Sequence, residues 1–330
     1  AVPSCTSRRD SLGSCTMAGS IVPRRGKPDT WYPAGFPDAN ARWLTLADGE
    51  RVRIVEHRVV GPADTGAHAL LLHGWGCNAF HFRHLAPALA QRGIRATAVD
   101  LRGHGLSHKP ASPAEYAASA ATRFVLRVLD ALELPRSGLV GHSLGGAMAL
   151  DTTADARERI AWLTLLNPVG LSRLAYAPLF TRVPAGAAEL VPALLSWMIG
   201  YAALYMAYGR LARPEPGDLQ QYVYPTLMPG GRRGMLAYAE AYNWEPRPAE
   251  LLERIVTPTH VMLGERDRVI KHREAVQHAA FIPHVNVDVV PQAGHVLAEE
   301  TPGRVSDVIA AQVAGLRAPN DALRVRGATR

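Results

Sequence analysis

A serine enclosed by glycines is the first candidate for chemistry in this chain. Ser143 lies in GHSLGG, residues 141–146, between the strand-like GLVGH and the helix-like LGGAMALD. Such a strand-turn-helix setting is typical of a nucleophile elbow, where small neighbours allow a strained serine to project from a sheet. We therefore expect Ser143 to be a nucleophile. The alternative is a purely structural turn between a strand and a helix.

A serine hydroxyl needs a base to remove its proton and a carboxylate to orient that base. Asp267 follows the apolar run PTHVMLG (258–264), and His295 follows HVNVDVVP (284–291). Loops at the carboxyl ends of parallel strands converge, so these side chains can meet Ser143. We expect His295 to be the base and Asp267 its orienting acid, with Glu265 as the alternative acid.

Other titratable side chains nearby favour structural roles. His260 and Asp288 lie within expected strands, and His272 and His284 flank a helix and a strand on an expected surface.

Attack on a carbonyl also needs donors for the oxyanion that forms. LLLHGWGCN ends a buried strand in a glycine-rich loop, so we assign the backbone N–H groups of Trp75 and Leu144 to an oxyanion hole. We expect the His73 imidazole to brace this loop rather than to react, and the Trp75 ring either to line the acyl pocket or to pack. The candidate substrate contacts are His73, Gly74, His142, Trp197, Tyr201 and Tyr205.

The elements that must position these residues follow from the apolar pattern. Residues 43–60 indicate two strands joined at Asp48–Gly49, a standard hairpin turn. Apolar runs at 68–74, 94–100, 137–143 and 160–167 then alternate with helical stretches, which indicates a parallel sheet covered on both faces. The alternation stops at 168–250 and resumes afterwards, so this block is expected to be an insertion between two strands.

Bulk composition sets broad limits. The 330 residues are 48% hydrophobic and 20% charged, as in a compact soluble enzyme. The net charge of +7 comes partly from arginines near both ends, and no basic-aromatic stripe indicates nucleic-acid binding. Cys5, Cys15 and Cys77 match neither a disulfide framework nor a zinc site. With no signal-peptide pattern, a cytoplasmic protein is expected, with Met17 as the natural start and residues 1–16 preceding it.

Taken together, these motifs resemble those of the alpha/beta-hydrolase family, in its esterase/lipase-like branch with a helical cap. The matching motifs are HGWG (73–76), DLRGHG (100–105), GHSLGG (141–146), GERD (264–267) and AGH (293–295). The resemblance implies a mostly parallel eight-stranded sheet with helices on both faces and a cap between strands 6 and 7. It also implies a structural role for Asp100, Arg102 and His104. Some members place the acid after strand 6, but Asn167-Pro168 stands there, which favours Asp267.

These boundaries predict a hydrolase core of residues 41–167 and 251–317 and a helical cap of residues 168–250. Residues 1–40 are an N-terminal extension and 318–330 a flexible tail. Leu190–Gly209 is uncharged and long enough to span a bilayer, but spanning would separate Ser143 from Asp267 and His295. We expect a cap helix whose Trp197, Tyr201, Tyr205 and Tyr208 share one face that either packs on the body or contacts substrate.

The sequence thus predicts a serine carboxylic-ester hydrolase that forms an acyl-enzyme on a small lipophilic ester and uses no metal or organic cofactor. Ser143 argues against haloalkane dehalogenases and epoxide hydrolases, which are expected to carry aspartate there. Carbon–carbon bond hydrolases, lactonases, amidases, aminopeptidases and perhydrolases stay open, as does a non-catalytic receptor for a small apolar ligand. An aminopeptidase would need cap carboxylates such as Glu189, Glu215, Asp218, Glu240 and Glu245. The apolar cap also permits transient contact with a lipid interface. The oligomeric state stays open.

Overall fold

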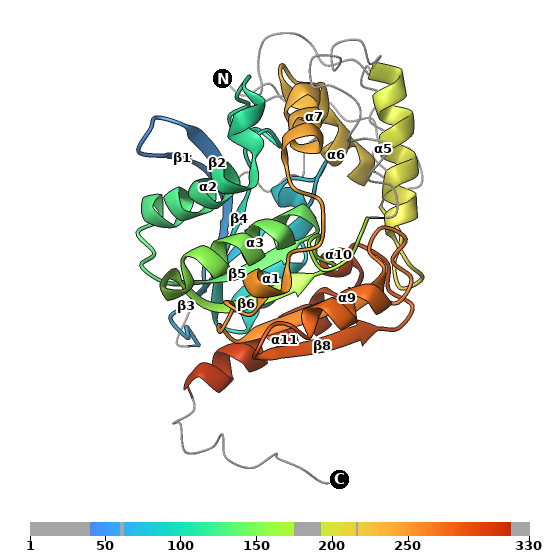
Figure 1. Ribbon diagram of the computed structural model, residues 1–330. Coiled ribbons are helices and arrows are strands. Elements are labelled where there is room, and N and C mark those ends of the chain that lie inside the picture. Colours follow the sequence, from blue (N-terminus) through green and yellow to red (C-terminus); the bar gives the residue numbers. More distant parts are fainter. Residues whose placement is uncertain (1–39, 60–62, 175–192, 216, 318–330) are drawn as a thin grey trace, which may run out of the picture.

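One eight-stranded sheet organises the structure, a computed structural model that describes residues 40–59, 63–174, 193–215 and 217–317 (Figure 1). The strand order is β1-β2-β4-β3-β5-β6-β7-β8. β2 is antiparallel to both of its neighbours, and all later pairs are parallel. The predicted eight-stranded, mostly parallel sheet is therefore confirmed. The strands are β1 (Ala41–Thr45), β2 (Arg51–His57), β3 (Ala67–Leu72), β4 (Ile94–Val99), β5 (Ser137–His142), β6 (Ile160–Leu166), β7 (Thr259–Gly264) and β8 (Val285–Val290).

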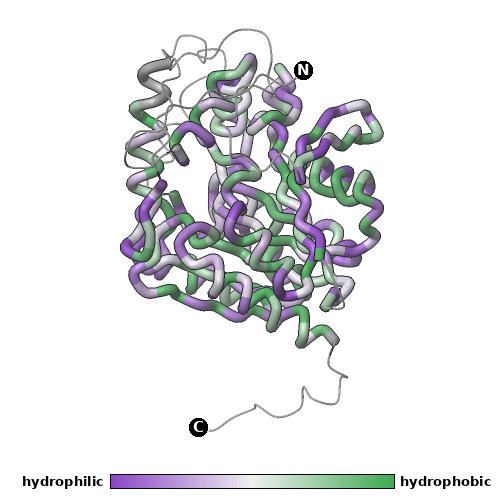
Figure 2. The backbone as a smooth tube through the Cα atoms, turned by 180° about the vertical axis from the view of Figure 1, so that it is seen from behind, coloured by the Kyte–Doolittle hydropathy of each residue, from purple (hydrophilic) through white to green (hydrophobic). Residues whose placement is uncertain are grey.

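Local sequence explains these strands well. The turn between β1 and β2 contains Gly49 at φ 83°, a left-handed conformation that costs glycine little. The central strands are almost continuously apolar because helices cover both of their faces, and the middle of the molecule is correspondingly hydrophobic in Figure 2. Within β5, Leu139 packs into the core on one side of the sheet and Val140 into the core on the other.

Helices cover both faces of the sheet, as expected. α2 (Ala118–Ala131), α3 (Leu144–Asp155), α8 (Ala249–Leu252) and α9 (His272–Ala279) belong to one side. α1 (Leu85–Gln91), α10 (Leu297–Glu300) and α11 (Pro302–Arg317) belong to the other. The described residues also form the short 3-10 helices η3 (Ala79–Phe82), η4 (Pro113–Tyr116) and η5 (Arg157–Arg159). Each face buries leucine, valine and isoleucine side chains, and full burial of one such side chain stabilises the fold by about 1.5–3 kcal/mol.

In the described part of the chain, α5 (Ala193–Ala207), α6 (Asp218–Leu227) and α7 (Gly231–Ala241) lie between β6 and the short helix α8. They gather at one end of the sheet, at the top of Figure 1. No helix within the described ranges combines the length and apolarity needed to cross a bilayer. Residues 190–192 of the apolar segment, residues 1–39 of the extension and all of the tail lie outside the described residues.

One expectation about this segment is wrong. Tyr208 was predicted to share a helix face with Tyr201 and Tyr205, but α5 ends at Ala207. The Tyr208 side chain is buried and its hydroxyl donates to Glu299, whereas Tyr201 and Tyr205 are exposed. The helix ends where the chain turns toward the core, so the helical spacing that relates Tyr201 to Tyr205 does not extend to Tyr208.

Candidate active site

Ser143 occupies a strained turn between β5 and α3. Its φ of 53° and ψ of −115° are rare for a residue with a side chain, and such a conformation costs on the order of 1–3 kcal/mol. Glycine makes the turn possible, since a Cβ on Gly145 would lie 2.1 Å from the Leu72 carbonyl oxygen. The hydroxyl-bearing residue is thereby held at the carboxyl end of β5, with only 7% of its surface exposed.

Asp267 and His295 are brought together from the loops after β7 and β8. His295 Nδ1 lies 2.7 Å from Asp267 Oδ2, and this carboxylate is fully buried. The other oxygen, Oδ1, accepts the backbone N–H groups of Val269 at 2.7 Å and Ile270 at 3.0 Å. Both oxygens are therefore fixed, and a carboxylate acceptor requires His295 to carry its proton on Nδ1, which leaves Nε2 as the basic nitrogen.

Glu265, the alternative acid, turns elsewhere. Its carboxylate accepts the backbone N–H of Gln292 at 3.0 Å, in an exposed position. The geometry therefore favours Asp267 as the partner of His295. His260 lies 3.4 Å from Asp288 between neighbouring strands, away from this contact.

The His295 ring lies beside the residue that precedes Ser143. The rings of His142 and His295 have centroids 4.8 Å apart, and His142 Nε2 lies 2.9 Å from the His295 carbonyl oxygen. Within the described ranges, no hydrogen bond joins Ser143 Oγ to His295. Catalytic hydrogen bonds are often long without substrate and tighten when it binds. The pairing of Ser143 with His295 therefore stays a prediction.

The loop carrying His295 is held by residues that the sequence did not single out. Asn167, just after β6, donates from Nδ2 to the carbonyl oxygens of Gly294 and His295, at 3.0 and 2.9 Å, and accepts the Gly264 N–H at 2.8 Å. Glu300 accepts the Gly294 N–H at 2.7 Å and the Gly209 N–H at 2.9 Å. Asn167 has φ 45°, a left-handed conformation that asparagine tolerates better than most residues.

The loop after β3 is braced as expected. His73 is buried, and burial lowers its pKa to about 3, so the ring is neutral. Its Nε2 accepts the Leu101 N–H at 3.0 Å, which leaves Nδ1 to donate to the Gly74 carbonyl at 2.8 Å. Both nitrogens of His73 are occupied, so its candidate role in substrate contact is not supported by this geometry. His104, whose pKa burial also lowers to about 3, accepts the Gly76 N–H at 3.1 Å.

The remaining part of DLRGHG also has structural contacts. Asp100 accepts the N–H groups of Ala79 at 2.8 Å and Leu106 at 2.9 Å. A Cβ on Gly105, which has φ 49°, would collide with this carboxylate. Arg102 is buried and donates from Nε to Glu50 at 2.8 Å. These contacts fix the loop that supports His73 and Gly76.

The candidate oxyanion donors belong to the start of α3 and to the loop after β3. The N–H of Leu144 is the first of α3 and has no hydrogen-bond partner within the described part of the chain. Gly74 approaches the nucleophile closely, since a Cβ there would lie 3.1 Å from Ser143 Cβ. The ring of Trp75 donates to the Met235 carbonyl of α7 at 2.8 Å, so this ring contacts the inserted helices.

The other candidate substrate contacts are placed as follows. The His142 ring is buried beside His295. Tyr201 and Tyr205 lie on α5 with ring centroids 4.5 Å apart and roughly half of each side chain exposed. Trp197 lies in α5, but its side chain is outside the described part of the structure. No contact joins Tyr201 or Tyr205 to Ser143 in the described structure, and their predicted contact with substrate stays a prediction.

A buried polar cluster behind His295 was also missed. The carboxylate of Glu299 accepts from His81 Nδ1 at 3.0 Å, from Arg83 at 2.9 Å, and from the hydroxyls of Tyr208 and Tyr222. Burial opposes its ionisation, but the hydrogen bond from His81 and the positive charges of His81 and Arg83 prevail and lower the pKa of Glu299 to about 2. Glu299 thus joins α6 and the residue after α5 to the helix that follows His295.

Comparison with known proteins identifies the family. The family model described as "Alpha/beta hydrolase family" matches residues 69–308. The chain belongs to the alpha/beta hydrolase family. This agrees with the sheet order, the elbow at Ser143 and the position of the histidine after β8.

Similar proteins in this family have several activities. Lipase 3 of Moraxella sp. is 27% identical over 303 residues, covering 87% of this chain and 89% of that protein. Mouse bifunctional epoxide hydrolase 2 is 24% identical over 331 residues, covering 89% of this chain and 58% of that protein. The solved structure of carboxylesterase CesB from Bacillus subtilis superposes with a TM-score of 0.67 at 20% identity, covering 83% of this chain and 91% of that one. These matches support a hydrolase and leave its substrate class open.

Proposed function

We propose that this protein is a serine carboxylic-ester hydrolase that acts through an acyl-enzyme on a lipophilic ester. The observation that carries the proposal is the strained Ser143 at the same sheet edge as the His295–Asp267 pair, whose donor and acceptor are 2.7 Å apart. The esterase and lipase relatives support the reaction class. The serine at the elbow argues against epoxide hydrolysis, because that chemistry is expected to use an aspartate at this position.

In the proposed mechanism, His295 Nε2 removes the proton of Ser143 as its oxygen attacks the ester carbonyl. The backbone N–H groups of Trp75 and Leu144 stabilise the oxyanion. His295 then gives this proton to the leaving alkoxide as the ester C–O bond breaks, which leaves an acyl group on Ser143. Water attacks the acyl-enzyme with the same base catalysis and restores the serine. Asp267 orients the imidazole throughout and stabilises its positively charged form.

A fluorophosphonate probe and a p-nitrophenyl ester series with acyl lengths from two to sixteen carbons test this proposal. We expect stoichiometric labelling at Ser143 and turnover of the esters, with both lost in S143A. S172A is a matched control, because Ser172 is a buried serine that follows β6. A folded wild-type protein that is neither labelled nor active on any ester would refute the proposal and favour a non-catalytic receptor.

We also propose that α5 contacts an anionic lipid surface. The helix exposes a group of large apolar side chains: Met198, Ile199, Tyr201, Tyr205 and Met206. Arg210 and Arg213 follow the helix directly and are exposed, so the apolar group has positive charge beside it, as in helices that bind the surface of anionic membranes.

Sedimentation with vesicles tests this contact. We expect binding to phosphatidylglycerol vesicles that exceeds binding to phosphatidylcholine vesicles and weakens in I199D. V256D is the matched control, since Val256 is also exposed but lies outside this helix. Equal sedimentation of wild type and I199D with phosphatidylglycerol would refute the contact.

A further inference from the structure

Three metal-ligating side chains from different elements meet beside the nucleophile. Cys77 lies in the loop after β3, His81 in η3, and His142 at the end of β5. One donor atom from each lies within 4.8 Å of the other two. His81 and His142 are completely or almost completely buried, and their rings stack with centroids 4.2 Å apart. A sulfur and two imidazoles form a donor set that zinc prefers in proteins.

The hydrogen bonds of His81 leave one nitrogen available. Its Nδ1 lies 3.0 Å from a carboxylate oxygen of Glu299, which accepts this hydrogen bond. Nδ1 must therefore carry a proton. In the neutral ring, Nε2 then carries a lone pair. This nitrogen is buried and has no hydrogen-bond partner in the described structure.

The same reasoning applies to His142 with the nitrogens exchanged. Its Nε2 lies 2.9 Å from the backbone oxygen of His295, which again can only accept. Nε2 therefore carries a proton, and in the neutral ring Nδ1 carries a lone pair. Nδ1 is also buried and has no hydrogen-bond partner among the described residues. The ring packs closely against Gly74, where a Cβ would lie 2.9 Å from this nitrogen.

We propose that Cys77, His81 and His142 form a zinc-binding site. A buried imidazole that donates one N–H to a carboxylate or carbonyl and keeps its other nitrogen free is the arrangement found in histidines that bind zinc. Cys77 joins as a thiolate, with its proton released to solvent. Because Glu299 and the His295 carbonyl orient the two rings, the site does not depend on the esterase assignment.

Binding requires a modest local closure. Ligand atoms of a tetrahedral zinc site lie about 3.3–3.6 Å apart, given zinc–nitrogen and zinc–sulfur distances of about 2.0–2.1 and 2.3 Å. The present spread of up to 4.8 Å and the 20° between the ring planes therefore call for one ring to turn about χ2, a torsion with a broad range in histidine. The 3-10 geometry of η3 places His81 on a short segment rather than within a long helix.

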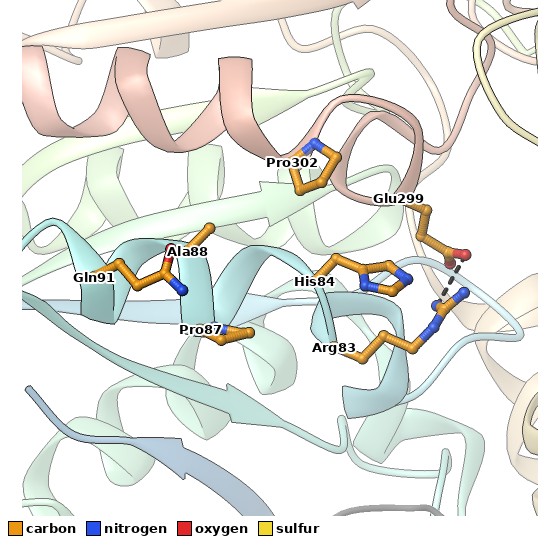
Figure 3. Close-up of a pocket in the computed structure, with 7 residues that line it drawn as sticks. All are labelled: Arg83, His84, Pro87, Ala88, Gln91, Glu299 and Pro302. Carbon is orange, nitrogen blue, oxygen red and sulfur yellow. Dashed lines mark ion pairs between the residues drawn. The ribbon is translucent and has the colours of Figure 1, made fainter.

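Glu299 is also one of the residues that line a pocket. This pocket of about 430 Å³ is lined at one end by Arg83 and Glu299, whose ion pair is drawn in Figure 3. The Glu299 side chain itself is almost fully buried. Ser143, Asp267 and His295 do not line this pocket, so a route through it would be separate from the proposed ester site.

Titration of metal-free protein with Co²⁺ tests the site, because cobalt substitutes for zinc and reports its ligands in its absorption spectrum. The C5S/C15S variant leaves Cys77 as the one cysteine in the chain. We expect this variant to bind one cobalt per chain with a sulfur-to-cobalt charge-transfer band that zinc abolishes. Adding C77S should remove the band, and H81Q should lower metal affinity at least tenfold. H84Q, a neighbouring exposed histidine, should change neither.

Two further measurements keep the result decisive. E299Q removes the carboxylate that orients His81, and loss of such a partner is expected to weaken metal binding by about 10–100-fold. Zinc should also raise the melting temperature of the C5S/C15S protein and leave that of the C77S derivative unchanged, which gives a test if H81Q does not fold. A folded C5S/C15S protein without the cobalt band, or a band of equal strength after C77S, would overturn the proposal.

Discussion

Replacing Asp267 with asparagine isolates the carboxylate that orients the candidate base. The side chain keeps its shape, but the structure shows one oxygen accepting two backbone N–H groups and the other 2.7 Å from His295 Nδ1. The amide will keep its oxygen toward the two N–H groups and turn its NH₂ toward His295. His295 then has to accept at Nδ1 and carries its proton on Nε2, so the nitrogen proposed to deprotonate Ser143 is no longer basic.

The expected loss is large. In a serine protease, the corresponding change to the wrong tautomer lowers kcat by about 10⁴, equivalent to about 5.4 kcal/mol at 1.36 kcal/mol per tenfold change in rate. We expect D267N to lower kcat for p-nitrophenyl butyrate by about 10³–10⁴ with little change in KM. Fluorophosphonate labelling of Ser143 should slow in parallel, because it requires the same base.

E265Q is the matched control, since Glu265 is the neighbouring carboxylate in the same loop and contacts only the Gln292 backbone in the described hydrogen bonds. Its kcat should stay within about threefold of wild type. Circular dichroism and thermal unfolding should show both variants folded. A D267N enzyme that retains more than a tenth of wild-type kcat, or an equal loss in E265Q, would refute the assignment of the acid.

Three further variants test the framework. G145A should fail to fold or lose several kcal/mol of stability in chemical denaturation, because its Cβ would lie 2.1 Å from the Leu72 oxygen, whereas G315A, with nothing within 4 Å, should be neutral or slightly stabilising. N167A should lower stability by about 2–4 kcal/mol through unpaired groups on the His295 loop and reduce kcat more than it raises KM. The pKa of Glu299 in the folded protein is about 2, below its ordinary 4.5, so its contribution to stability is complete above about pH 5 and disappears as the pH falls toward 2. E299Q should therefore be about 3–5 kcal/mol less stable than wild type at pH 7, and its stability should depend less steeply on pH in the acid range. An unchanged acid slope would contradict this role.

The fold and the nucleophile could be predicted from the sequence because their determinants are local. Continuous apolar runs separated by helical stretches specify strands buried on both faces, and each run expected to form a parallel strand does so. The glycines around Ser143 indicate a close strand-to-helix approach, since no other residue fits there. Chain order and strand ends also indicated Asp267 and His295, with Glu265 kept as the alternative acid.

Only the tertiary structure decided the choices that depend on distant contacts. Glu265 and Asp267 are both carboxylates in the loop that follows β7. The backbone of this loop turns the Asp267 carboxylate inward and leaves that of Glu265 at the surface. Because α5 ends at Ala207, the Tyr208 hydroxyl reaches Glu299. His81 contacts the same carboxylate, although it lies more than two hundred positions away in the sequence. Sequence periodicity describes one element at a time, whereas a buried charge is stable only where several elements supply its hydrogen bonds together.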